Sequence, residues 1–171
     1  MNVAVETGLW QLEPEASAVT LKHRTVWGLV TVKGAFAAVS GGGEVAADGA
    51  ATGTLTLDVS SLDTGNAKRD AHLRGADFFD VDRHPEITFV ARSVELRDGG
   101  TVQVSGRLTV RGISRPHSFT ARLSDASADT LALDAEFTVD RAQFGMDWNQ
   151  MGMMRGLTTV TTSLRFKRAN G

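Results

Sequence analysis

Strict alternation of apolar and polar residues is the feature that most constrains the fold of this chain. From residue 101 to 110, the even positions hold Val, Gly and Leu, and the odd positions hold Thr, Gln, Ser and Arg. Because successive side chains of a strand point to opposite faces, this run predicts a strand with one dry and one wet face. The same period recurs at 19–23, 55–59, 87–91, 117–123, 131–139 and 158–166, and a further strand is expected over about 32–39. The total is about eight strands, a number that small closed antiparallel barrels commonly use.

Short polar and glycine-rich stretches between these runs predict where the chain reverses. Residues 98–100 (Asp-Gly-Gly) and 125–129 each separate two alternating runs, as hairpin turns do. The phase of the alternation shifts near residues 92–93, which predicts a β-bulge or bend there. Residues 41–43 are all glycine and are interpreted as a turn. They are not a phosphate-binding loop, because no helical pattern and no Lys-Ser/Thr pair follows them.

One short helix is predicted, over residues 66–76. Asn66 can cap its start, and Ala67, Ala71 and Leu73 are expected to face inward. A sheet with one dry face must close or be covered, and the sequence offers no long amphipathic helices as a cover. Closure into a barrel is therefore the simplest solution, and it also removes exposed sheet edges. We expect an all-β fold and a single domain over residues 1–171.

Composition and charge exclude several classes of function. The chain has 18 basic and 20 acidic side chains, and the resulting net charge of −2 does not fit a general nucleic-acid-binding protein. The absence of Cys excludes disulfides, thiolate zinc sites, iron–sulfur clusters and cysteine nucleophiles. The N-terminus does not resemble a secretory signal, and the longest uncharged stretch, 34–43, is too short to span a membrane. We therefore expect a cytoplasmic protein with no nucleic-acid partner and at most transient membrane contact.

Periodicity alone leaves open whether the barrel is hollow or filled. Small residues at inward positions favour a hollow lumen: Ala91, Gly106, Ala121, Ala135 and Thr162. In the alternative interpretation, inward phenylalanines fill the space that these residues leave: Phe36, Phe89, Phe119, Phe137 and Phe166. A hollow barrel of this size can hold one small ligand, whereas a filled one is a structural scaffold.

Several sequence blocks resemble one protein family in their order and spacing. The most specific block is KRDAHLR at 68–74, followed by DFFDV at 77–81 and HPEITF at 84–89. The other blocks are Trp10, LEP at 12–14, Ser17, LKH at 21–23, VKGAF at 32–36, VSSLDT at 59–64, VSGRLTVRGI at 104–113, Pro116, VDR at 139–141 and FG at 144–145. From Trp10 to Phe166 the chain is thus similar to the YceI-like family, a family of lipocalin-like, polyisoprenoid-binding proteins.

The resemblance implies an extended eight-stranded antiparallel barrel with a deep apolar pocket. In that pocket the family holds a long isoprenoid chain, such as a polyprenyl phosphate or an isoprenoid quinone, or another amphiphilic lipid. Storage, transport or sequestration of the lipid is the implied function. Family members are often exported, and this sequence departs from them because it shows no leader.

Candidate ligand contacts follow from the inward face and from two interruptions of the strand pattern, the helix region and a Met-rich loop over 141–156. Unbranched Met side chains adapt well to a flexible apolar ligand, although the same residues would also suit a hydrophobic plug. The candidates are Leu21, His23, Trp27, Phe36, Leu57, Leu73, Phe78, Phe79, Phe89, Leu108, Phe119, Phe137, Phe144, Met146, Trp148, Met151 and Met153. Candidates for contact with the head group are Lys68, Arg69 and His72.

An enzyme acting at the barrel mouth is the alternative function, with Asp70, His72 or Arg141 as candidate groups. Asp70 and His72 are two residues apart on a helix and do not share a face, so Asp70 is expected to be a structural tie to backbone N–H groups or to an Arg. His23 lies on an apolar face and fits a hydrogen-bonded core residue as well as a ligand contact. The histidines are scattered, and no His-x-x-x-His motif occurs, so we expect no metal, no cofactor and no catalytic residue. A homodimer is compatible with these features.

Overall fold

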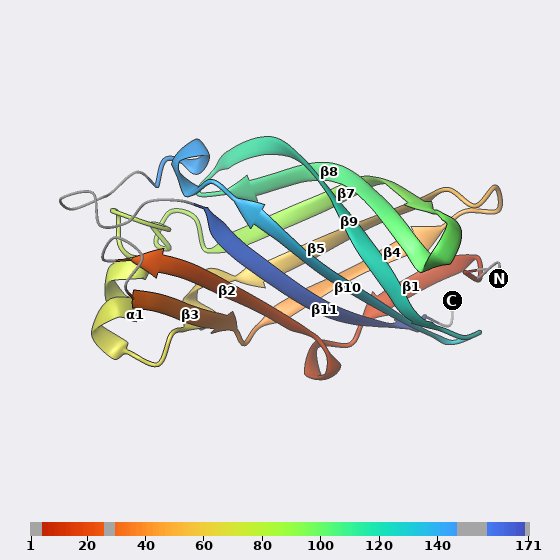
Figure 1. The fold of residues 1–171 in the computed structure, drawn as a ribbon, viewed down its shortest axis with the longest axis horizontal. Coiled ribbons are helices and arrows are strands. Elements are labelled where there is room, and N and C mark those ends of the chain that lie inside the picture. Colours follow the sequence, from red (N-terminus) through yellow and green to blue (C-terminus); the bar gives the residue numbers. More distant parts are fainter. Residues whose placement is uncertain (1–4, 26–29, 147–156, 170–171) are drawn as a thin grey trace.

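Strands of one antiparallel sheet make up most of the described chain, and the sheet closes on itself (Figure 1). The structure is a computed structural model that describes residues 5–25, 30–146 and 157–169. The strands are β1 (Gly8–Leu12), β2 (Ala18–Thr25), β3 (Val30–Phe36), β4 (Val39–Val45), β5 (Ala51–Asp58), β6 (Leu62–Asp63), β7 (Glu86–Leu96), β8 (Thr101–Val110), β9 (Ile113–Ala126), β10 (Thr130–Val139) and β11 (Thr158–Arg168). The helix α1 spans Ala67–Arg74, and four 3₁₀ turns are η1 (Pro14–Ala16), η2 (Val59–Ser61), η3 (Asp98–Gly100) and η4 (Arg141–Phe144).

These strands occupy eight positions around a closed barrel. The strands β1 and β2 both pair with β11 and are separated only by η1, so they act as one interrupted strand. In the same way, β3 continues into β4 after residues 37–38, and β5 continues into β6 after η2. The pairing of β1 with both β4 and β11 closes the ring. The predicted eight-stranded antiparallel barrel with one short helix is therefore confirmed.

The predicted reversals and the predicted bulge are present. The turn at 98–100 connects β7 to β8, and residues 127–129 connect β9 to β10, where the Ser127 N–H donates to the Thr130 carbonyl. The register of β7 against β8 shifts between Ala91 and Ser93. This is where the alternation of the sequence changes phase, so the sequence pattern located the bulge correctly.

The glycine cluster at 41–43 is not a turn, which corrects the prediction. It lies in the middle of β4, and the predicted strand over about 32–39 instead breaks at residues 37–38 into β3 and β4. A Cβ on Gly41 would lie 2.4 Å from the carbonyl oxygen of Thr54, and one on Gly43 would lie 2.7 Å from that of Thr52. Glycine is needed here because the neighbouring backbone approaches too closely for a side chain.

The helix begins as predicted, but its buried face is different. The Asn66 side chain accepts a hydrogen bond from the Arg69 N–H at 3.0 Å, which caps the first turn. Ala67 and Ala71 are exposed rather than inward, and Leu73 is half-buried. The buried residue of α1 is Asp70, because a polar contact with the preceding segment, and not an apolar stripe, fixes the helix at the end of the barrel.

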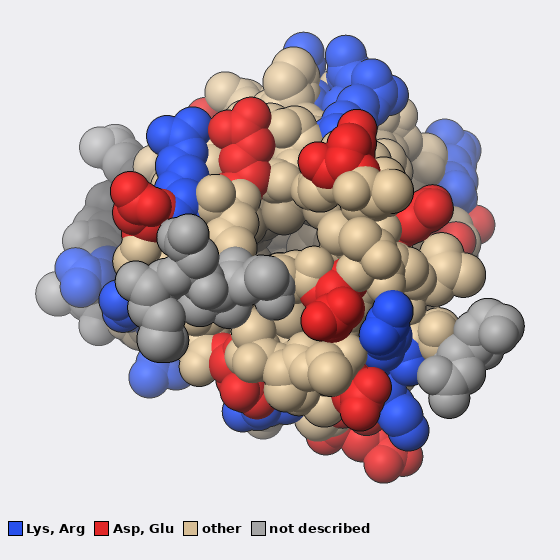
Figure 2. All heavy atoms as spheres, turned by 90° about the vertical axis from the view of Figure 1, so that its right-hand side faces the viewer, with Lys and Arg blue, Asp and Glu red and all other residues tan. Residues whose placement is uncertain are grey.

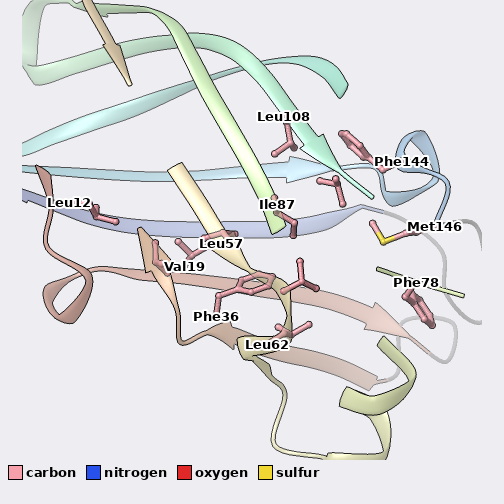
Figure 3. Packing of buried hydrophobic residues seen from close by; sticks show 13 residues of the cluster. Leu12, Val19, Phe36, Leu57, Leu62, Phe78, Ile87, Leu108, Phe144 and Met146 are labelled. Atoms are coloured by element: carbon pink, nitrogen blue, oxygen red, sulfur yellow. The ribbon is translucent and has the colours of Figure 1, made fainter. Parts of the chain in front are cut away.

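The packed core lies toward the end of the barrel that carries α1 (Figure 3). Its largest buried cluster contains Leu12, Val19, Phe36, Val39, Leu57, Val59, Leu62, Phe78, Ile87, Leu108, Val110, Phe144 and Met146. A second, smaller cluster of Ala91, Val102, Val104 and Ala121 joins β7, β8 and β9. Among the described residues, no helix is long and apolar enough to cross a membrane.

Candidate ligand-binding site

The barrel is hollow. A cavity of about 940 Å³ runs through it, bordered at one end by residues of α1 and the segment after it, such as Leu73 and Phe79, and at the other by Val45 and Leu96. Its walls are the inward-facing side chains that the alternation of the strands predicts, and most of them are apolar. Of the two interpretations that the sequence left open, the hollow lumen is confirmed.

Small side chains on neighbouring strands leave room inside the barrel. Ala135 of β10 pairs with Ala121 of β9 and with Thr162 of β11, so the three lie side by side in one row around the wall. All three border the cavity. Because none of them reaches far into the lumen, this row accounts for part of the space that larger residues would fill.

An aromatic wall lies next to the row of small residues. It consists of Phe89 on β7, His117 and Phe119 on β9, and Phe137 on β10, all of which border the cavity. Phe119 and Phe137 stack with their ring centroids 4.7 Å apart, and His117 lies 4.7 Å from Phe137 and 5.7 Å from Phe119. Phe89 approaches His117 edge-on at 6.2 Å. The wall offers flat, polarisable surface to a ligand.

His117 places a polar group in this aromatic wall. Its Nε2 is buried and has no hydrogen-bond partner in the described part of the chain. Burial lowers the pKa of His117 from its usual value of 6.5, so the ring is neutral at neutral pH. His117 was not among the predicted ligand contacts, although its position two residues before Phe119 in the alternating run places it on the inward face.

The lowered pKa of His117 predicts a loss of stability in acid. In the unfolded chain His117 binds a proton with a pKa near 6.5, whereas in the folded chain this pKa is lower. The free energy of unfolding therefore falls as the pH drops below 6.5. Below the folded-state pKa the loss levels off. We expect His117→Gln to remove this part of the pH dependence, as measured by urea unfolding at about pH 8 and about pH 5. Equal acid sensitivity of both proteins would contradict the assignment.

Buried apolar side chains gather at the α1 end of the barrel. Phe78, Phe144 and Met146 are almost fully buried and lie near one another at this end of the cluster (Figure 3), and they also border the cavity. Arg111 ties the segments at this end together, since its Nη2 donates to the Ala76 carbonyl at 2.6 Å and its Nη1 donates to the Gly145 carbonyl. The same residues therefore belong both to the buried core and to the lining of the lumen.

The side chains of Arg69, His72 and Arg141 border the cavity at the α1 end, and each is held by other residues. Arg69 donates from Nε to the Thr64 hydroxyl at 2.9 Å and from Nη2 to the Thr64 carbonyl at 3.0 Å. His72 Nε2 lies 3.1 Å from a carboxylate oxygen of Asp77. Arg141 donates to the Met146 carbonyl at 2.5 Å. Lys68, the other head-group candidate, is exposed on α1 and does not border the cavity.

The predicted ligand contacts are brought together wherever the structure describes them. Trp27, Trp148, Met151 and Met153 lie outside the described residues. The remaining candidates all border the cavity: Leu21, His23, Phe36, Leu57, Leu73, Phe78, Phe79, Phe89, Leu108, Phe119, Phe137, Phe144 and Met146. His23 also forms the expected core hydrogen bond, with Nδ1 2.9 Å from the Thr158 hydroxyl.

Asp70 forms a structural tie, as predicted. Its Oδ1 accepts from the Thr64 backbone N–H at 3.0 Å and from the Thr64 hydroxyl at 2.5 Å. The same hydroxyl accepts from Arg69, so Thr64 joins two charged side chains of α1, Arg69 and Asp70. The contact holds α1 against the end of the barrel.

Removal of this tie should lower stability. Asp70→Asn weakens hydrogen bonds to a buried carboxylate, so we expect the free energy of unfolding to fall by about 1–3 kcal/mol. Thr64→Val should have a similar effect, and the double variant should lose less than the sum of both, as measured by urea unfolding. Additive losses would show that the two side chains do not act together.

The opposite end of the barrel, where β1 begins and β11 ends, is hollowed. Figure 2 looks onto this end and shows a recess at its centre, with acidic side chains at several places around it. Glu44 and Leu96 border the cavity here, and Leu96 is 41% exposed. The cavity thus reaches the surface at the end away from α1.

Comparison with known proteins agrees with this architecture. The sequence model of the YceI-like domain matches residues 10–166, which is most of the chain. The chain belongs to the YceI-like family. Curated YceI relatives match a shorter segment: a UPF0312 protein of Pectobacterium atrosepticum and Protein YceI of Shigella flexneri are each 39% identical over 69 residues, or 40% of this chain. The matched segment spans 35% and 36% of their respective lengths.

Solved structures share the YceI-like barrel. BcnA of Burkholderia cenocepacia has a TM-score of 0.80 at 21% identity, and the match covers 90% of this chain and 98% of that one. A polyisoprenoid binding domain from Saccharophagus degradans has a TM-score of 0.77 at 16% identity, covering 94% of this chain and 98% of that one. At such identities the likeness establishes the fold.

Proposed function

We propose that this protein binds a long-chain isoprenoid lipid in the barrel lumen and stores, transports or sequesters it without catalysing a reaction. The observation that carries the proposal is the apolar cavity of about 940 Å³ that extends from α1 to the opposite end of the barrel. Membership of the YceI-like family and the likeness to a polyisoprenoid binding domain support it. The isoprenoid tail of a polyprenyl phosphate or a quinone fits such a lumen.

The tail supplies most of the binding free energy in this proposal. Burial of one methylene contributes about 0.8 kcal/mol, so a five-carbon unit contributes roughly 4 kcal/mol before the chain is ordered. Ordering the flexible chain and losing its free motion offset much of this gain, and micromolar affinity is expected. At roughly 30 Å³ per carbon group, close to the liquid volume of a water molecule, a cavity of this size holds about six such units.

This capacity gives a test of the proposal by chain length. We expect the affinity of delipidated protein for polyprenols to rise steeply with each added unit up to about six and then to level off. Fluorescence competition or native mass spectrometry with polyprenols of about two to ten units measures the dependence. Solvent extraction of freshly purified protein should also release an isoprenoid. A protein that binds no polyprenol of any length would refute the proposed function.

The geometry at the α1 end bears on the enzyme alternative and on the head group. Asp70 accepts two hydrogen bonds from Thr64, which supports a structural role for this carboxylate. Arg69 and His72 remain our candidates for contact with a head group that reaches this end, and Lys68 adds positive charge on the outer side of α1. The tail, in contrast, needs only the apolar walls.

A further inference from the structure

The outer surface of β2 and β3 carries a cluster of cations at the end of the barrel where α1 lies. β2 ends and β3 begins at this end (Figure 1). The neighbouring residues of each strand border the cavity, so Lys22, Arg24 and Lys33 point to the solvent, and all three are exposed. These three side chains form the basic face of the barrel. Lys68 of α1 adds a further exposed cation at the same end.

The basic face opposes two like charges instead of pairing each with a carboxylate. Lys22 lies directly opposite Lys33 in the register of β2 and β3. Among the described residues, no carboxylate forms an ion pair with the basic face. Asp63, which lies opposite Ala35 of β3, accepts a hydrogen bond from the Gly65 N–H instead. Like charges in opposite positions of an antiparallel pair destabilise a sheet, so a negatively charged partner would compensate this arrangement.

Exposed apolar side chains lie at the same end of the barrel. Val30, the first residue of β3, is 44% exposed and also borders the cavity. Leu157 is 53% exposed and comes two residues before Thr159, which pairs with Lys22. Cations beside exposed apolar side chains match the surface of an anionic lipid bilayer, where phosphate groups lie over hydrocarbon.

The two ends of the barrel differ in charge. At the end away from α1, Glu44 borders the cavity together with the exposed Leu96, and further acidic side chains surround the recess (Figure 2). An anionic bilayer repels such a surface and attracts a basic one. Charge therefore favours approach to the bilayer by the α1 end, where Val30 connects the lining of the lumen to the surface.

We propose that this protein docks on anionic lipid bilayers through the basic face, with Val30 and Leu157 entering the interfacial layer. In this orientation the α1 end of the lumen lies at the membrane. The inference goes beyond the proposed function, because it concerns the outer surface and holds whatever occupies the lumen. Nucleic acid, another polyanion, presents its phosphates without a hydrocarbon layer for the two apolar side chains.

Cosedimentation of the delipidated protein with vesicles tests the proposal. The vesicles consist of phosphatidylcholine alone or with about 30% phosphatidylglycerol. We expect the wild type to prefer the anionic vesicles and to lose affinity as salt is added. The double variant Lys22→Gln with Lys33→Gln should bind them about 25-fold more weakly, a factor of about five for each cation. Its midpoint of urea unfolding should stay equal or rise, because two opposed like charges are removed.

Arg165→Gln with Lys167→Gln is the matched control. Both residues are exposed on β11 toward its end away from α1, and their replacement removes the same charge. This variant should bind the anionic vesicles as the wild type does. Equal losses in the two double variants would overturn the proposal, since they would show a response to net charge alone. Tighter binding of the wild type to double-stranded DNA than to the anionic vesicles would overturn it as well.

A further outcome concerns the edge of β3. In the described part of the chain, residues 30–34 pair with β2 alone, and lysines can protect such an edge from pairing with other chains. Self-association of the Lys22→Gln, Lys33→Gln variant with wild-type vesicle affinity would assign the lysines to this role and overturn docking. A wild type that binds polyprenols but no vesicles overturns docking alone, and one that binds anionic vesicles but no polyprenol overturns the proposed function alone.

Discussion

Gly106→Ala is expected to destabilise the barrel severely, by about 3–5 kcal/mol, or to prevent folding altogether. Gly106 lies in β8, between Ala91 of β7 and His117 of β9 in the register of the sheet. A Cβ at this position would lie 2.0 Å from the Val90 carbonyl oxygen and 2.9 Å from the Ala91 Cα. Both atoms belong to the backbone at the bulge of β7, so the added methyl group cannot be accommodated by a side-chain rotation. The midpoint of urea unfolding measures the effect.

Gly49→Asn provides the control for a general loss of glycine. Gly49 has a positive φ of 88°, and a Cβ there would meet no atom within 4 Å. Asn tolerates this backbone conformation better than most residues. The free energy of unfolding of the Gly49→Asn variant should therefore stay within about 1 kcal/mol of that of the wild type. A Gly106→Ala protein as stable as Gly49→Asn would show that β7 and β8 do not approach so closely.

The alternation of side chains carries enough information to predict the barrel and the walls of its lumen. Every second residue of β8 and of the middle of β9 faces inward, so the alternation alone assigns Leu108 and Phe119 to the lumen. The bulge at residues 91–93 could also be located, because an extra residue reverses the face on which later side chains lie. A strand's two-residue period fixes each face independently of tertiary contacts, which is why these assignments hold.

Features that depend on neighbouring elements could not be predicted in this way. Gly41 and Gly43 lie in β4, where glycine is needed because the carbonyl oxygens of Thr54 and Thr52 are too close for a Cβ. The sequence pattern contains no such distance, so these glycines were predicted to form a turn. The buried face of α1 was also assigned wrongly, because Asp70 is fixed by Thr64 and not by apolar packing. Whether the lumen was hollow depended on how far side chains from opposite walls reach, which periodicity does not determine.

Ala135→Phe is expected to abolish binding of long isoprenoids while leaving the barrel folded. Ala135 lies between Ala121 and Thr162 in the row of small residues, and its side chain borders the cavity. A phenyl ring is much larger than the methyl group of alanine and projects into the lumen, where its direct cross-strand partners are the small side chains of Ala121 and Thr162. We expect affinity for a polyprenol of about six units to fall at least about 100-fold, because the tail must give up several buried methylenes. Titration of the delipidated variant measures the loss.

Chain length distinguishes this blockage from a general defect. A short polyprenol of about two units can occupy one side of the constriction, so its affinity should fall by less than about threefold. Ala135→Ser keeps the small volume and should bind both lengths as the wild type does. The stability of Ala135→Phe should stay equal or rise, since the ring buries apolar surface in a cavity instead of displacing packed atoms. If the variant binds long polyprenols with unchanged affinity, the tail does not pass this row of small residues, and the lumen beyond it is not part of the site.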